Sequence, residues 1–382
     1  MLDRLSSKIF AAAAAAALLF AAFLFGYGVG RQSAHTEAAD FSLLNEVESH
    51  IRQAAVGKVD RDSLLNGAIQ GMVRSLDDPY SEYLDAASYR AVRDSLTSHF
   101  SGVGISIKQE GEEFEVVTVL DNTPAARAGI VPGDRIVSVD GDPVGGLKVG
   151  EVAQAIQGDP GSRVTITVNR GAQALDFTLE RERIERVVAE GELLQSRLGL
   201  VEVIAFTSGT GKEVREIVRG LIAEGALGFI LDLRGNPGGL LDEGVEVAGT
   251  FLDRGRVVSY RERGESEVVY QAPGSPETQL PLVVMVDAGT ASAAEIVAGA
   301  IQDRGRGIVI GTQTYGKGSV QTLIPLSDGS AIKLTTASFF TPSGRAVSDR
   351  GINPDIRIDD RALQLARAQE ILREILALGP AA

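Results

Sequence analysis

The spacing of apolar residues changes several times along this chain, and each change marks a predicted element or domain. Ile9–Val29 is an uncharged apolar stretch, which as one helix spans roughly 30 Å, the thickness of the hydrocarbon core of a bilayer. Residues 40–99 carry apolar side chains at helical spacing, which predicts a small helical arm. Residues 100–183 contain short β-branched runs separated by glycine–aspartate turns, with a helical segment among them. This pattern predicts a mostly-β domain.

The remainder of the chain alternates strands with helices. Residues 184–360 show buried-type strands followed by amphipathic helices, which is typical of an α/β core. Residues 361–382 carry an apolar stripe that predicts a closing C-terminal helix. The predicted fold class is therefore multidomain, α/β plus mostly-β, with an N-terminal membrane helix and a small helical arm.

The charges around the first apolar stretch predict its orientation. Arg4 and Lys8 precede it and Arg31 follows it, which favours residues 1–8 in the cytoplasm and residues 9–29 as a transmembrane anchor. The rest of the chain would then lie on the periplasmic or extracellular side. A cleaved signal peptide is the alternative, but no convincing small-x-small cleavage site follows Arg31. The pattern favours an uncleaved anchor.

The composition of the chain excludes several kinds of site and partner. With 37 basic and 51 acidic residues the formal net charge is -14, so binding to phosphate backbones is not expected. The absence of cysteine excludes a thiol nucleophile, a disulfide framework and a cysteine-ligated zinc site. The three histidines, His35, His50 and His99, all precede the mostly-β domain. A histidine base would have to reach the α/β core from outside it, and no cofactor is predicted.

Ser292 is the first candidate for catalysis. A buried-type strand runs into Asp287–Ser292, and a helix is predicted to begin at Ala293. A strand-to-helix turn of this kind exposes a hydroxyl next to the free amides of the helix, which suits nucleophilic attack and oxyanion binding. The alternative is an ordinary N-cap, the commonest reason for a hydroxyl residue at a helix start. Asp232–Gly239 forms a second loop, whose glycines either make a tight turn or let backbone amides approach a ligand closely.

Lys317 is the second candidate. Gly311–Gly318 nearly matches a phosphate-binding loop, but that loop needs Ser or Thr after the lysine and then a helix. Here Gly318 and an apparent strand follow, so nucleotide hydrolysis is a remote alternative. To act as a base, Lys317 needs its pKa lowered from about 10.4 to roughly 7–8, or about 3–5 kcal/mol, by burial. Gln321 could orient the amine without adding a counter-charge if the chain curls at Gly318.

Two motifs at a fixed spacing carry a family resemblance. Thr290–Ile296 and Tyr315–Gln321 resemble the nucleophile and lysine motifs of the C-terminal processing peptidases, also called tail-specific proteases. The resemblance extends from about Asp77 to Asp355 and implies a serine protease core at 184–360 of the ClpP/crotonase-like type. It implies this catalytic set: Ser292 as nucleophile, Lys317 as general base, Gln321 as the residue that positions the lysine, and the amides of Gly238 and Ala293 as the oxyanion hole.

The mostly-β domain resembles the PDZ module of the same family. The segment implied to bind peptides consists of Ser101, Gly102, Val103, Gly104 and Ile105. A PDZ module binds C-termini by strand addition and by amide capture of the carboxylate. The implied substrates are proteins with accessible or unfolded C-termini. Gln157 stands where relatives often carry a basic residue, which leaves PDZ control of activity open.

These observations predict a membrane-anchored extracytoplasmic serine endopeptidase that uses a Ser–Lys dyad. The main alternative is a membrane-anchored PDZ scaffold whose protease-like domain is inactive. The expected partners are protein substrates and the membrane, with a second copy at the helical arm and an activating adaptor protein as further candidates. Nucleic acid is not expected as a partner.

Overall fold

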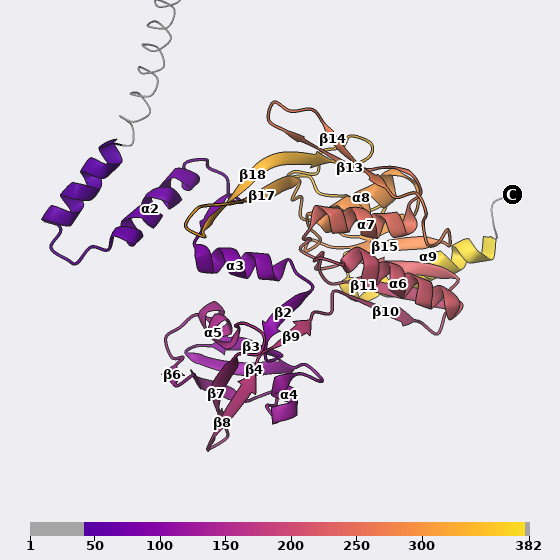
Figure 1. Ribbon diagram of the computed structural model, residues 1–382. Helices are drawn as coiled ribbons and strands as arrows, with labels where there is room; N and C mark the ends of the chain where they lie inside the picture. Colours follow the sequence, from indigo (N-terminus) through magenta and orange to yellow (C-terminus); the bar gives the residue numbers. More distant parts are fainter. Residues whose placement is uncertain (1–41, 379–382) are drawn as a thin grey trace, which may run out of the picture. The chain divides into compact units, whose positions relative to one another are not determined.

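The computed structural model describes residues 42–378 and divides the chain into two compact units, residues 1–77 and 78–382 (Figure 1). The predicted N-terminus and membrane segment, residues 1–29, lie outside the described residues. Within residues 42–378, no helix combines the length and the apolar composition that a bilayer crossing requires. The membrane segment therefore stays a prediction.

The described part of the first unit is helical. Residues 42–54 form one helix and α2 (Arg61–Arg74) the next. Asp60 caps α2 by accepting a hydrogen bond from the backbone N–H of Ser63 at 2.9 Å, which satisfies an amide that the helix leaves free. Large apolar side chains of these helices are exposed, among them Leu43 and Met72. The helical spacing predicted for residues 40–99 is found in these helices and again in α3 (Ala86–Ser95) of the second unit.

The mostly-β part of the second unit is an antiparallel sheet with two short helices. Its strands run in the order β3-β4-β5-β7-β8, with β6 paired to β5. Alternate residues of β7, Val164, Ile166 and Val168, are buried, as expected for a strand with one face on a core. The bounds are β3 Ile105–Glu110, β4 Glu113–Val119, α4 Pro124–Ala128, β5 Arg135–Val139, β6 Asp142–Pro143, α5 Val149–Ile156, β7 Arg163–Arg170 and β8 Gln173–Glu180. A ribbon of β2 (His99–Gly102) and β9 (Glu182–Glu185) flanks the sheet in sequence.

The α/β core is a six-stranded sheet in the order β10-β11-β12-β15-β16-β19, parallel except at β10. The strands are β10 Ala189–Leu193, β11 Leu198–Val203, β12 Gly228–Asp232, β15 Leu282–Val286, β16 Ile308–Gly311 and β19 Ile356–Arg357. Every residue of β12 and β15 is buried. Continuous apolar strands of this kind are typical of a parallel sheet covered on both faces.

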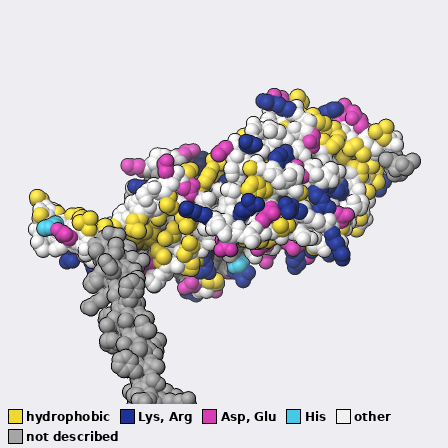
Figure 2. Space-filling view, turned by 90° about the horizontal axis from the view of Figure 1, so that it is seen from above, with side chains coloured by type: hydrophobic (Ala, Val, Ile, Leu, Met, Phe, Trp, Pro, Cys, Tyr) yellow, Lys and Arg dark blue, Asp and Glu magenta, His cyan; other side chains and the backbone are white. Residues whose placement is uncertain are grey.

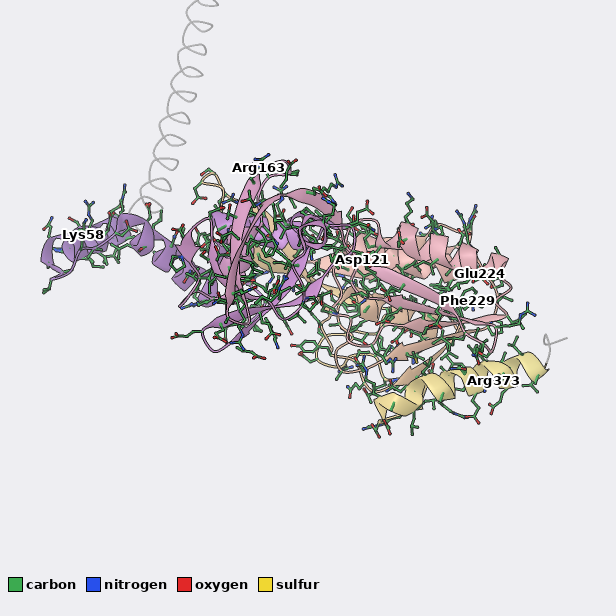
Figure 3. All side chains as sticks on the ribbon, turned by 90° about the horizontal axis from the view of Figure 1, so that it is seen from below. Lys58, Asp121, Arg163, Glu224, Phe229 and Arg373 are labelled. Atoms are coloured by element: carbon green, nitrogen blue, oxygen red, sulfur yellow. The ribbon has the colours of Figure 1, made fainter. Side chains whose placement is uncertain are left out.

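Helices cover both faces of this sheet. α6 (Thr210–Ala223), α7 (Leu241–Phe251) and α8 (Ala293–Asp303) share one apolar core with the side chains on one face of the sheet. α9 (Arg361–Leu378) packs Ala368 and Leu372 against the other face. Figure 3 shows this layering, with Phe229 of β12 between the layers and Arg373 on α9. The arrangement leaves the carboxyl ends of the strands free to carry loops.

A second, antiparallel sheet adjoins those loops. It contains β1 (Glu82–Leu84), β18 (Ala331–Phe340), β13 (Gly255–Glu262) and β14 (Val268–Ala272), and β17 (Ser319–Pro325) also pairs with β18. The β17–β18 ladder is interrupted by a bulge between Val320 and Gln321. Through β18, this sheet connects the segment around β1 with the strand that follows Lys317.

Candidate active site

Three loops meet where neighbouring parallel strands end. Leu233–Gly239 follows β12, Asp287–Ser292 follows β15, and Thr312–Lys317 follows β16. Because the three strands are adjacent and parallel, their carboxyl ends lie at one edge of the sheet, where α/β folds bind ligands. All of the catalytic candidates except Gln321 lie in these loops or directly after them.

Ser292 occupies a strained turn between β15 and α8. Its backbone angles are φ 53° and ψ -118°, a region that residues with a side chain rarely adopt and that persists only where surrounding contacts impose it. Thr290 supplies such contacts, because its hydroxyl donates to the Leu233 carbonyl and accepts from the Asp287 N–H. Ser292 is the N-cap residue of α8, and its backbone N–H donates to the Glu295 carboxylate at 2.8 Å, as in a capping box. An ordinary N-cap has extended backbone angles, so capping alone does not account for the strained conformation.

Gly238 lies directly against the nucleophile candidate. Its φ is 91°, and a Cβ at this position would lie 2.6 Å from the Ala291 carbonyl oxygen, 2.7 Å from Ser292 Cβ and 2.9 Å from the Ala293 nitrogen. Only glycine fits so close an approach. The predicted residues Gly238, Ser292 and Ala293 are thus brought together. The Gly238 N–H donates to Asn236 Oδ1 at 2.8 Å in this conformation, whereas Ala293 begins α8, where backbone N–H groups lack intrahelical partners.

Lys317 lies half-buried beside an aromatic ring. Its Nζ atom is 5.2 Å from the centroid of the Tyr80 ring. Burial lowers the pKa of Lys317, the charge of Lys333 lowers it further, and the charge of Glu295 opposes the shift. This is the direction that a lysine base requires. The residue is followed by Gly318 and strand β17, so the helix that a nucleotide loop needs is absent after it.

Gln321 lies on β17, beyond the bulge. Its amide nitrogen donates to Ser319 Oγ at 2.7 Å and to Thr335 Oγ1 at 3.4 Å. Among the residues that the structure describes, no hydrogen bond joins Lys317 Nζ to Gln321 or to Ser292. The structure brings Gln321 to the sheet that follows the lysine loop, and its orienting role stays a prediction.

Glu295 is a functional candidate that the sequence reasoning missed. Its side chain is fully buried and accepts the backbone N–H groups of Ser292, Gly316 and Lys317 at 2.8, 2.7 and 2.9 Å. The Thr314 hydroxyl also donates to it. Burial raises the pKa of this carboxyl, against four hydrogen bonds that favour the charged form. One carboxylate thus connects the Ser292 turn with the loop that carries Lys317. The available signal was an acidic residue three positions after Ser292, which is the spacing of a capping box.

The predicted peptide-binding segment borders a small cavity. The cavity is lined by Phe100, Gly102, Val103, Gly104, Ile105, Ile107, Ala153, Ile156 and Gln157. It therefore lies between β3 and α5, the place where a PDZ module takes a C-terminal strand. Ser101 is not part of the lining, and its hydroxyl is buried without a hydrogen-bond partner. Four of the five predicted residues line the cavity.

Comparison with known proteins identifies the architecture. Residues 197–358 match peptidase family S41, residues 115–170 match the PDZ domain, and residues 28–88 match the activating protease CtpB N-terminal domain. The chain is 35% identical to the carboxy-terminal processing protease CtpA of Bacillus subtilis, a match that covers 87% of this chain and 72% of the relative. It is 38% identical to the carboxy-terminal-processing protease of Bartonella bacilliformis, covering 86% and 76%. The chain belongs to the S41 carboxy-terminal processing proteases.

Membership confirms the resemblance carried by the two motifs. Among solved structures, the photosystem II D1 C-terminal processing protease is similar to this chain, with 30% identity, a TM-score of 0.53 and coverage of 86% of this chain and 96% of that protein. The protein is therefore a serine peptidase with a PDZ domain.

No group of three or more His, Cys, Asp or Glu side chains that could hold a metal occurs within residues 42–378. Figure 2 shows basic and acidic side chains interspersed on one face.

Proposed function

We propose that this S41 protease is a membrane-anchored extracytoplasmic endopeptidase that cleaves with a dyad of Ser292 and Lys317. The observation that carries the proposal is the strained backbone of Ser292, a non-glycine residue at φ 53° that lies directly against Gly238. Strain of this kind is retained where a reactive group must be presented. The lowered pKa of Lys317 supplies the matching base.

The proposed reaction is acyl transfer in two steps. Neutral Lys317 removes the proton of Ser292 Oγ, which attacks the scissile carbonyl carbon, and the resulting ammonium protonates the leaving amine. Lys317, neutral again, then takes a proton from water, and the hydroxide attacks the acyl carbon. The ester bond to Ser292 Oγ breaks, and the lysine ammonium returns its proton to that oxygen. The amides of Ala293 and Gly238 stabilise the oxyanion. The Gly238 N–H must exchange its bond to Asn236 for one to substrate, so we place this exchange at substrate binding.

Gln321 is proposed to orient the Lys317 amine. It lies four residues after the lysine, on the strand that continues from it. To reach the amine, its side chain would give up its bonds to Ser319 and Thr335. A neutral amide suits this task because it fixes direction without raising the pKa of the lysine.

The PDZ domain is proposed to select substrates by their C-termini. The cavity between β3 and α5 is lined mainly by apolar side chains and glycine backbone, which fits an extended peptide with an apolar last residue. Replacing that residue by aspartate in an unfolded substrate should raise KM several-fold while kcat changes little. Equal KM values for both tails would contradict C-terminal selection by this domain.

Membrane attachment and self-association are proposed from the N-terminal part of the chain. Residues 9–29 would anchor the protein, with residues 30–382 on the periplasmic or extracellular side. The exposed apolar side chains of α2 and of the preceding helix are suited to pair with a second copy or with an activating partner. Protease protection of residues 30–382 in intact cells would test the location, and sedimentation of the full chain in detergent would test the association.

The dyad is tested by degradation of an unfolded model protein by the full chain, comparing wild type with Ser292→Ala and Lys317→Ala. Cleavage by wild type alone, with all three proteins folded, is the expected result. Full cleavage by either variant would overturn the assignment. Cleavage by none of the three would favour the inactive scaffold or point to a missing activator, and adding a peptide that occupies the PDZ domain separates those two cases.

A further inference from the structure

A tyrosine from outside the α/β core lies beside the amine of Lys317. Tyr80 lies in the segment that begins the second unit at Asp78, more than two hundred residues before the lysine in sequence. Its ring centroid is 5.2 Å from Lys317 Nζ, within the distance at which an aromatic face attracts a cation. The proposed mechanism gives this ring no task, although it is the aromatic group beside the base.

The Tyr80 segment is fixed by several independent contacts. Asp78 accepts the Tyr80 backbone N–H at 3.1 Å and also the Ser81 hydroxyl. The Ser81 oxygen in turn accepts the backbone N–H of Thr335 at 3.0 Å. β1 then pairs with β18, and Lys333 of β18 forms an ion pair with Glu82 at 2.6 Å. The backbone under Tyr80 is therefore attached to β18, the strand that also pairs with β17 after the lysine loop.

The Tyr80 side chain also contacts Tyr315. A hydrogen bond with the Tyr315 hydroxyl raises the pKa of Tyr80 to about 12, so Tyr80 stays neutral over the working range of a protease. The Tyr315 backbone N–H donates to the Thr290 carbonyl at 3.0 Å, in the nucleophile turn. Tyr80 is thus connected to β18 through its own segment and to Thr290 through Tyr315.

We propose that Tyr80 is a positioning residue for the general base, and that its ring covers the Lys317 amine and keeps water from it. The inference rests on the proposed Ser–Lys dyad. It makes residues 78–84, which lie within the range predicted as the helical arm, part of the active site, so the base is complete only when this segment is paired with β18.

Two effects of the ring on the lysine oppose each other. A cation–π contact favours the ammonium. Exclusion of water disfavours the ammonium and shifts buried lysines by up to about 3–5 pKa units. Since burial is the largest influence on Lys317, removing the ring should raise the pKa of the lysine. The charged and titratable groups around the pair are Glu295 from α8, Lys333 from β18, Tyr315 from the lysine loop, Asp78, and Asp349.

The first test is the pH dependence of kcat/KM for cleavage of an unfolded protein by the full chain. In Tyr80→Ala the acidic limb should move up by about one pH unit, which lowers the rate at pH 7 about tenfold. Tyr80→Phe keeps the ring and should keep the wild-type limb, with a loss of no more than about threefold. Tyr89→Ala is the matched control, because Tyr89 is a nearby half-buried tyrosine whose ring contacts Arg93 at 5.9 Å. An unmoved limb in Tyr80→Ala, or equal shifts in the Phe and Ala variants, would overturn the proposal.

A second readout does not need activity. In the Ser292→Ala background, the rate of reductive methylation of Lys317 is followed against pH by mass spectrometry, because only the neutral amine reacts. Tyr80→Ala should shift the midpoint upward by about one unit and Tyr80→Phe should not. An unchanged midpoint would overturn the role of Tyr80 alone. Wild-type cleavage by Lys317→Ala would instead overturn the dyad, so the two failures are distinguishable.

Discussion

Ser292 and Lys317 follow neighbouring parallel strands, yet the structure holds the two side chains in different ways. The Ser292 backbone is forced into a strained conformation by bonds within the turns at the ends of β12 and β15. The Lys317 backbone is held by Glu295, but its amine lies against the Tyr80 ring and forms no hydrogen bond with Ser292 or Gln321. Ser292 is thus positioned by its own backbone, whereas the surroundings of Lys317 position its amine and lower its pKa.

Because the amine of Lys317 is half-buried, we expect replacement of Lys317 to have opposite effects on activity and on stability. Lys317→Met should reduce cleavage to background, by about 10³-fold or more, and should raise the melting temperature by a few degrees at pH 7. The reason is that folding places an ammonium where burial disfavours it, so its pKa falls below the ordinary 10.5. Thermal unfolding measured by circular dichroism checks the second effect.

The gain in stability of Lys317→Met should decrease as the pH rises. The folded lysine binds its proton less tightly than the unfolded one, so wild-type stability is lowest below the folded pKa and rises with pH up to about 10.5. The advantage of Lys317→Met should therefore shrink as the pH approaches 10.5. A gain that does not change with pH would indicate better packing by methionine rather than removal of a buried charge.

Glu295 accepts hydrogen bonds from both the Ser292 turn and the Lys317 loop, so its loss should displace both segments. Glu295→Ala leaves the buried N–H groups of Ser292, Gly316 and Lys317 without their acceptor. An unsatisfied buried group costs about 1–3 kcal/mol, so we expect a loss of several kcal/mol in unfolding free energy, with at least about 10²-fold lower kcat. Urea unfolding and steady-state kinetics measure the two quantities.

Glu295→Gln serves as the matched variant, since it keeps the shape and one acceptor oxygen. It should recover much of the stability. The recovery is incomplete because the glutamine NH2 group is a donor and cannot accept from the backbone N–H groups. Stability and kcat equal to wild type in Glu295→Ala would show that the two loops hold their positions without this carboxylate.

Gly238 tests how closely the nucleophile turn is packed. In Gly238→Ala the new methyl group would meet the Ala291 carbonyl oxygen at 2.6 Å and Ser292 Cβ at 2.7 Å, at a φ of 91°. Moving the loop away removes one oxyanion donor, which typically costs about 10²–10³-fold in kcat. KM should change less, because the PDZ domain still binds the tail. A variant with wild-type kcat would remove Gly238 from the oxyanion hole.

Gln321 is expected to have the smallest effect. Since its amide is bonded to Ser319 and Thr335, Gln321→Ala should lower kcat by about tenfold or less, within the range of a residue that only orients a base. Gln321→Glu adds a charge near Lys317 and should move the acidic limb of kcat/KM upward. An unmoved limb in the glutamate variant would place Gln321 out of reach of the amine.

The sequence predicted the elements that local patterns encode. The apolar runs of β12 and β15 and the alternation in β7 indicate from the sequence alone which residues are buried. Ser292 and Lys317 follow the ends of such strands. The family motifs added Gly238 and Ala293, which the structure brings against Ser292.

Contacts between distant segments could not be predicted in the same way. The pairing of β1 with β18 joins residues about 250 positions apart, and Tyr80 reaches Lys317 only through that pairing. Glu295 carries the spacing of a capping box, but its bonds to Gly316 and Lys317 depend on a loop that arrives from another strand. Such contacts follow from sheet topology, which the spacing of apolar residues does not specify.

Activation of Ser292 by Lys317 can be measured by labelling the full chain with a fluorophosphonate and locating the modified residue by mass spectrometry. The label reports the reactivity of the serine without needing a substrate or the PDZ domain. We expect a single modified residue, Ser292, with a labelling rate that rises with pH as Lys317 loses its proton and that falls at least about 10²-fold in Lys317→Ala. Equal labelling of Ser292 in wild type and Lys317→Ala would contradict it.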